Sequence, residues 1–328
     1  WRVAILKHKW TVHEAEMGAI SDGEDVLIPE IMQQIERAGV HSGDSMAVYP
    51  GVDLTEHEAK TMVDYAIQIG RGLKIKGLMN IQFDILREGD KSTVYIIETN
   101  PRASRTVPFI SKVTGVPMVK IAVNVMLGKS LKEQGYSSGL WPTQHLVAIK
   151  APVFSMSKLI GVDTYLGPEM KSTGEVMGID YTFEAALAKA LQAAGLMPSA
   201  KDAMLISIAD RDKSEALPII RKFAGVGFKL YATEGTAAMI EAAGLPVTLI
   251  TKKLNEGHPN VIDVIVNGTV NCVVNTVTGG RAPLRDGFQI RRASTEKRIP
   301  CYTSLDTARA VADALVNGNP TYYARPLP

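Results

Sequence analysis

From residue 203 onward, short apolar runs alternate with stretches that have helical spacing. The predicted strands are 203–208, 229–232, 247–250 and 271–275, and the predicted helices are 212–224, 235–243, 261–267 and 305–316. Strands that alternate with helices predict a parallel sheet, because each crossover between parallel strands needs a long connection. The uninterrupted apolar run at 203–208 is typical of a strand buried on both faces. This half of the chain therefore predicts a doubly wound α/β domain.

Polar residues follow these predicted strands, at the edge where parallel α/β sheets bind ligands. Thr233 and Thr236 flank Gly235 at a predicted helix start, where backbone amides and the helix dipole favour an anion. The two threonines could instead only cap the helix. Because the ends of several strands carry polar groups, the pattern favours a phosphorylated ligand. The other polar positions are Ser207, Lys213, Lys252, Lys253, Asn275, Thr276 and Thr278.

The first half has a different pattern. A helix from Glu56 to Leu73 is predicted by its apolar spacing and by Thr55 and Glu58, which form a capping box. Two apolar strands, 79–84 and 94–97, flank a polar turn and predict a hairpin. Helices are also predicted at 106–114, 116–127 and 183–194, with a strand at 145–152 and a loop at 129–143. The best domain boundary is 197–200, which gives domains 1–196 and 197–328.

The second strand of this hairpin ends in Glu98 and Asn100, which point to one face because strand side chains alternate. A carboxylate and an amide oxygen suit Mg²⁺, which prefers oxygen ligands. Arg102 and Arg105 follow and could hold phosphate. Alternatively, this is a polar strand end with solvated arginines. The hairpin would place Gln82 beside Glu98 and Asn100, which favours magnesium–nucleotide chemistry.

The segment Gly39 to Ser42 follows a helical pattern and opens into extended chain. Its backbone groups and His41 are placed to contact an adenine or ribose edge, although a single histidine is more often packed or exposed without a ligand. The surrounding residues favour the nucleotide reading.

Several phrases together resemble the large chain of the carbamoyl phosphate synthetase family. They are AGVHSGDS, MNIQFD, IETNPRASRTVPFISKVTGVP and GVDTYLGPEMKSTGEVMGID, in that family's order and spacing. The resemblance implies the end of an ATP-grasp domain, a mixed or antiparallel sheet with helices. It implies that Mg²⁺ or Mn²⁺ binds Gln82, Glu98 and Asn100, and that Arg102 and Arg105 are catalytic residues facing the phosphates. The implied ATP contacts are Glu14, Gly39, Val40, His41, Ser42, Gln82 and Glu98, although residues 15–18 depart from the family pattern around Glu14.

The second half resembles the methylglyoxal-synthase-like module that ends the same large chain and binds regulators. The resemblance implies an effector site for a nucleotide or ornithine made by Ser207, Lys213, Thr233, Thr236, Lys253, Asn275 and Thr278. Val277 stands where some members have a hydroxyl. Arg281 stands where methylglyoxal synthase itself needs an aspartate, which disfavours a lyase. A lyase or a purely binding module is the alternative, and turnover of dihydroxyacetone phosphate would test the former.

The family resemblance implies a ligase that makes carbamoyl phosphate for arginine and pyrimidine biosynthesis, with a glutamine amidotransferase small subunit as partner and a possible homo-oligomer. It also places the glycine-rich lobe of the ATP site before residue 1, so we expect this chain alone to be inactive. A free-standing ATP-grasp ligase is the rival, and it would need that lobe. The net charge of +2 favours neither nucleic acid nor membrane as a partner. Cys272 and Cys301 lack metal spacing and predict free thiols in a cytoplasmic protein.

Overall fold

The computed structural model describes residues 12–155, 162–198, 202–252, 257–276 and 286–317. The described residues divide into two compact units, 12–150 with 179–186, and 151–178 with 187–317. The predicted domain boundary after residue 196 stays a prediction. Lys253, Thr278 and Arg281 lie outside the described residues.

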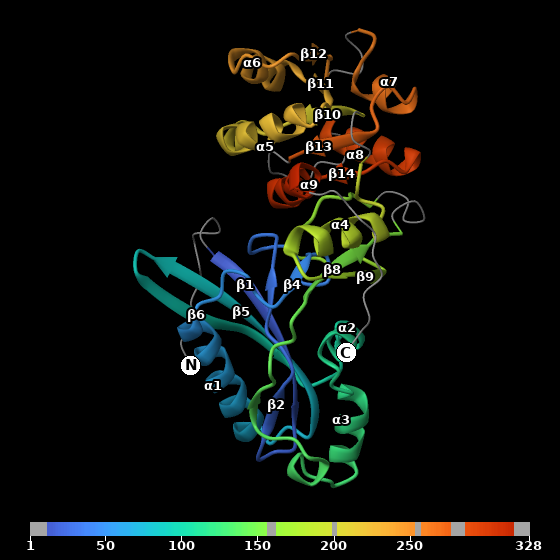
Figure 1. The fold of residues 1–328 in the computed structure, drawn as a ribbon. Helices are drawn as coiled ribbons and strands as arrows, with labels where there is room; N and C mark the ends of the chain where they lie inside the picture. Colours follow the sequence, from blue (N-terminus) through green and yellow to red (C-terminus); the bar gives the residue numbers. More distant parts are fainter. Residues whose placement is uncertain (1–11, 156–161, 199–201, 253–256, 277–285, 318–328) are drawn as a thin grey trace. The chain divides into compact units, whose positions relative to one another are not determined.

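Most of a nine-stranded sheet lies in the first unit, with β6-β5-β1-β3-β4-β8-β9 as its main path and β2 and β7 attached through β1 (Figure 1). The pairings from β6 to β8 along this path are antiparallel, and β2 pairs in parallel with β7. The strands are β1 (Val12–Ser21), β2 (Val26–Ile28), β3 (Met32–Gln34), β4 (Ala47–Tyr49), β5 (Gly77–Glu88), β6 (Lys91–Asn100), β7 (Gly139–Leu140), β8 (Val147–Val153) and β9 (Gly174–Asp180).

The predicted hairpin is confirmed as β5 and β6. Gln82 lies opposite Glu98, and Asn80 lies opposite Asn100. The register shifts by one residue after Gln82, which is a β-bulge. The bulge precedes Glu98 on β6. Glu98 and Asn100 both follow the bulge, so they still point to the same face.

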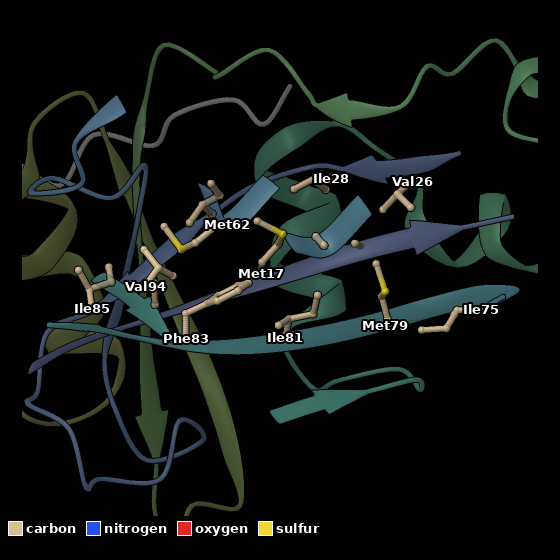
Figure 2. Close-up of a cluster of buried hydrophobic side chains, with 14 residues drawn as sticks. Met17, Val26, Ile28, Met62, Ile75, Met79, Ile81, Phe83, Ile85 and Val94 are labelled. Atoms are coloured by element: carbon tan, nitrogen blue, oxygen red, sulfur yellow. The ribbon is translucent and has the colours of Figure 1, made fainter. Parts of the chain in front are cut away.

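One face of this sheet carries the apolar core. Met17, Ile81 and Phe83 of the central strands are fully buried against Met62 of α1 (Glu56–Gly72), as Figure 2 shows. The capping box predicted at Thr55 and Glu58 is confirmed. The remaining helices of this half are α2 (Val107–Thr114), α3 (Met118–Met126), the short 3-10 helix η1 (Lys132–Gln134) and α4 (Phe183–Ala193).

The helix predicted at 106–114 ends as expected at Gly115, whose φ of 72° is a left-handed conformation that glycine adopts without strain. Within the described part of the chain, no single helix is long and apolar enough to cross a membrane. The bent pair α2 and α3, at 112°, meets that test of length and composition only jointly.

The second unit contains a five-stranded parallel sheet in the order β12-β11-β10-β13-β14. Its strand order reverses between β10 and β13, as a doubly wound sheet requires. Figure 1 shows α5, α6 and α9 along one face and α7 and α8 along the other. The elements are β10 (Ala203–Ser207), η3 (Asp210–Asp212), α5 (Lys213–Gly225), β11 (Lys229–Ala232), α6 (Glu234–Ala242), β12 (Thr248–Leu249), α7 (Val261–Val266), β13 (Cys272–Asn275), α8 (Asp286–Lys297), β14 (Cys301–Tyr302) and α9 (Leu305–Asn317).

Two elements of this unit, α8 and β14, were not expected from the sequence pattern. Helix α8 has the sequence DGFQIRRASTEK, in which few apolar residues mark a buried side. Ile290 and Ala293 nevertheless pack into the core, and Arg291 and Ser294 are buried beside them. Cys272 and Cys301 are free thiols, as predicted, and burial raises the pKa of Cys301 to about 12.

Candidate nucleotide and effector sites

The face of the first sheet opposite its core is polar. Side chains of directly paired residues share a face, and Glu16 on β1 pairs with Gln82 on β5, which pairs with Glu98 on β6. One step along the strands, Glu14 pairs with Asp84. Three neighbouring strands therefore bring carboxylates and amides onto one surface.

The predicted metal ligands lie together at one end of this surface. Asn100 donates through Nδ2 to Glu98 Oε1 at 2.8 Å, and Gln82 donates through Nε2 to Ser42 Oγ at 2.7 Å. Both amide groups use their nitrogen in these bonds, so their carbonyl oxygens remain available as ligands together with the Glu98 carboxylate. These are the hard oxygen donors that Mg²⁺ prefers, and the residues fit that ion. No group of three or more His, Cys, Asp or Glu that could hold a metal occurs among the described residues.

The loop with the predicted ATP contacts lies over the same surface. Glu14 Oε1 accepts from the Gly39 amide at 3.1 Å, and Gly39 has a φ of 104° that suits glycine alone. His41 turns back on its own loop, where its Nδ1 accepts from the Gly43 amide at 3.0 Å. The structure therefore brings Glu14, Gly39 and, through Ser42, Gln82 into one site.

Two cations hold the carbonyl groups of this loop. Lys150 on β8 donates through Nζ to Ser42 O at 2.8 Å, and Arg105 donates to Gly43 O at 2.8 Å. Lys150 Nζ also lies 3.7 Å from Glu16 Oε1, and both side chains are almost fully buried. Arg102 is exposed and donates to the carbonyl of Ala103, whereas Arg105 is half-buried.

Several carboxyl groups on this face lack full hydrogen bonding. Burial raises the pKa of Glu14 to about 7, with smaller contributions from Asp84 and Glu16, and it raises the pKa of Asp84 to about 6. Burial also raises the pKa of Glu30 well above its ordinary value. Glu30 Oε2, Asp84 Oδ1 and both amide atoms of Gln34 are buried without a partner. Such orphaned atoms are the groups that a polar ligand would satisfy.

The Glu14 environment predicts a pH-dependent loss of stability. The pKa of the Glu14 carboxyl is about 7 in the folded chain and 4.5 in the unfolded chain. As the pH rises, the unfolded chain therefore loses the Glu14 proton before the folded chain does. The stability that Glu14 contributes below pH 4.5 is lost as the pH rises to 7. Glu14→Gln keeps an acceptor for Gly39 and cannot ionise. We expect it to match the parent at pH 4.5 and to exceed its free energy of unfolding by about 3 kcal/mol at pH 8. Urea unfolding at both pH values measures this.

The exposed Glu88→Gln on the same sheet is the matched control, and it should leave the difference between the two pH values unchanged. A Glu14→Gln protein that lost stability in parallel with the parent between pH 4.5 and 8 would contradict the prediction.

In the second unit, the predicted effector residues collect at the carboxyl ends of the central strands. Ser207 ends β10 and pairs with Asn275 at the end of β13, the point where the strand order reverses. Thr233 makes no capping bond to α6 and instead donates through Oγ1 to Ser207 Oγ at 3.3 Å. Thr236 Oγ1 accepts from the Ile208 amide at 3.0 Å, which ties α6 to the end of β10.

Lys213 supplies the positive charge of this site, and Gly235 leaves room for it. Lys213 pairs with Asp210 at 2.7 Å, and its Nζ would lie 2.9 Å from a Cβ atom placed on Gly235. The absence of a side chain at Gly235 thus lets the ammonium group approach the N-terminus of α6. An ammonium group beside helix amides makes an anion site. Thr276, one of the polar positions at the strand ends, accepts from the Ala209 amide at 2.8 Å. The sequence pattern gave no role to Lys150 or Asp84.

Comparison with known protein families finds a match in each of the two units. Residues 4–134 match the family model described as "Carbamoyl-phosphate synthase L chain, ATP binding domain", and residues 215–303 match "MGS-like domain". The chain is 55% identical over 315 residues to the carbamoyl phosphate synthase large chain of Thermomicrobium roseum. It is a relative of the carbamoyl phosphate synthase large chain. The match covers 96% of this chain but only 29% of that relative, so the chain spans less than a third of the large chain's length.

Solved structures show weaker likeness. The chain is 18% identical to the biotin carboxylase domain of a single-chain bacterial carboxylase, with a TM-score of 0.42, over 57% of this chain and 46% of that one. It is 16% identical to the biotin carboxylase–β-γ-ATP complex from Campylobacter jejuni, with a TM-score of 0.43, over 58% and 46%. The resemblance to carbamoyl phosphate synthase thus comes from the sequence comparisons.

Proposed function

We propose that the chain is the carboxyl-terminal part of a glutamine-dependent carbamoyl phosphate synthase, whose first unit phosphorylates carbamate. The observation that supports this is the pairing of Gln82 with Glu98 next to Asn100, on a chain 55% identical to a carbamoyl phosphate synthase large chain. In this reaction a carbamate oxygen attacks the γ-phosphorus of ATP, the bond to the β,γ-bridging oxygen breaks, and ADP leaves. The product is carbamoyl phosphate, used for arginine and pyrimidine biosynthesis.

The residues of the first unit have separate roles in this proposal. Glu98, Asn100 and Gln82 hold Mg²⁺ or Mn²⁺, which when bound offsets charge on the phosphate oxygens. Arg105, fixed on the Gly43 carbonyl, and Arg102 stabilise the negative charge that develops on the transferred group. Glu14 holds the Gly39 amide and so positions the loop that contacts the nucleotide.

In the same proposal, the second unit binds a phosphorylated effector or ornithine at Ser207, Lys213, Thr233, Thr236 and Asn275, with Lys253 and Thr278 completing the predicted set. The support is the approach of Lys213 to the α6 N-terminus beside buried hydroxyls. Isothermal titration with UMP, IMP and ornithine tests it. We expect heat with at least one of the three ligands. The complete enzyme is proposed to be cytoplasmic, with an amidotransferase small subunit and possible self-association.

Gly235→Ala separates ligand binding from stability. Alanine favours a helix over glycine by about 1 kcal/mol, whereas its Cβ would push the Lys213 ammonium group away from the helix N-terminus. We expect the melting temperature to stay level or rise, while UMP or IMP binds about tenfold more weakly. Differential scanning calorimetry and isothermal titration measure the two effects.

Gly225→Ala at the end of α5 is the matched control, because no atom lies within 4 Å of a Cβ placed there. It should leave nucleotide affinity unchanged. Unaltered affinity in Gly235→Ala would remove Lys213 from the anion site.

A further inference from the structure

A buried arginine lies directly behind the proposed effector site. Arg291 on α8 is 5% exposed, and its Nη1 donates to Asn275 Oδ1 at 2.6 Å. Asn275 in turn donates through Nδ2 to Ser207 O at 3.3 Å. The guanidinium group therefore fixes the orientation of the Asn275 carboxamide. The carboxamide oxygen accepts from Arg291, and the amide nitrogen points toward Ser207.

The other side of Arg291 binds a distant segment of the chain. Its Nε donates to Asp163 Oδ1 at 2.6 Å and its Nη2 donates to Asp163 Oδ2 at 2.5 Å, a bidentate pair between residues 128 positions apart. Burial alone would raise the pKa of Asp163, but the hydrogen bonds and charge of Arg291 lower it below its ordinary value. The planar guanidinium group fixes the directions of all its donors, so the contacts with Asp163 and Asn275 cannot change independently.

The segment that carries Asp163 has a second attachment besides Arg291, because the Leu166 amide donates to Thr303 Oγ1 at 3.3 Å, just after β14. Within the segment, the Tyr165 amide donates to Asp163 Oδ1 at 3.2 Å. In the chain, this segment joins β8 to β9, two strands of the nine-stranded sheet. There is little free space around Arg291, because a Cβ on Gly287 would lie 3.0 Å from its Nη1.

We propose that Arg291 is a positioning residue of the effector site, which orients Asn275 and, through Asp163, couples effector binding to the segment between β8 and β9. This inference rests on the proposed effector function. A ligand that contacts the Asn275 amide changes the hydrogen bonds that Arg291 makes with Asn275 and Asp163. By linkage, breaking or keeping the Arg291–Asp163 pair changes the affinity for that ligand by the same factor.

The experiment uses UMP and IMP as probes and two conservative variants of the chain. Arg291→Lys keeps the positive charge but cannot bind Asp163 and Asn275 together, and Asp163→Asn keeps the shape but removes the charge. Arg292→Gln on the same helix, which breaks the pair with Glu296 at 2.7 Å, is the matched control. Circular dichroism melting checks that each variant folds.

The readouts are nucleotide affinity and hydrogen exchange of the Tyr165 amide, which reports on Asp163 and is not at the strand ends. In the parent, we expect bound nucleotide to slow this exchange. We expect Arg291→Lys and Asp163→Asn to bind nucleotide about tenfold more weakly and to show no slowing. Arg292→Gln should keep the parent affinity and the slowing. A merely structural role for Arg291 would not alter the exchange response to ligand in a folded variant.

Two results would overturn the inference, and they differ. If the parent binds UMP or IMP and both variants bind equally well with the Tyr165 response intact, the coupling is wrong and the effector site stands. If the parent binds neither nucleotide, the effector assignment itself fails and the coupling falls with it.

Discussion

Lys150→Met is expected to lower the free energy of unfolding of the first unit by about 3–5 kcal/mol, the usual cost of leaving a buried charge unpaired. Lys150 Nζ lies 3.7 Å from Glu16 Oε1, and these side chains are 2% and 4% exposed. Methionine fills a similar volume, so the loss comes from the unpaired Glu16 carboxylate and the Ser42 carbonyl. All three tryptophans lie at residues 1, 10 and 141, so tryptophan fluorescence during urea unfolding follows this half of the chain.

Lys60→Met is the control, because it removes an exposed pair with Asp64 whose side chains are 73% and 47% exposed. Such pairs contribute about 0–1 kcal/mol. The double variant Glu16→Gln/Lys150→Met should recover part of the lost stability, because it no longer buries an unpaired charge. If Lys150→Met lost no more stability than Lys60→Met, Lys150 would not be paired as the structure shows it.

Glu98→Gln is expected to reduce carbamate phosphorylation about 100-fold or more in the complete synthase to which we assign this chain. Glutamine keeps the size and one oxygen donor but removes the only negative charge among the three proposed metal ligands, Gln82, Glu98 and Asn100. The reverse reaction isolates this step, because ADP and carbamoyl phosphate yield ATP without glutamine or bicarbonate. Luciferase detection of ATP measures its rate, and Mn²⁺ titration should show weaker metal binding.

The matched control is again Glu88→Gln, which makes the same chemical change at the exposed far end of the hairpin. It should keep the parent rate. A Glu98→Gln enzyme that made ATP at the parent rate with unchanged Mn²⁺ affinity would remove Glu98 from the metal site and with it the support for carbamate phosphorylation here.

Local signals in the sequence predicted much of the fold. The helix capped by Thr55 and Glu58, the helix stop at Gly115 and the hairpin of β5 and β6 all depend on neighbours within a few residues, so their patterns can be read directly. The same hairpin register placed Gln82 beside Glu98, which is why the metal set could be predicted. Helix α8 could not, because Arg291 and Ser294 occupy its buried side and leave no apolar stripe.

The sequence by itself determined the two kinds of sheet, the family and the polar groups at each strand end. Only the tertiary structure decided which partners the buried cations Lys150 and Arg291 have. Lys150 reaches the Ser42 carbonyl across 108 residues, and Arg291 reaches Asp163 across 128. No local pattern marks such pairs, since the partner that makes burial of a charge tolerable is supplied by another strand or loop after folding.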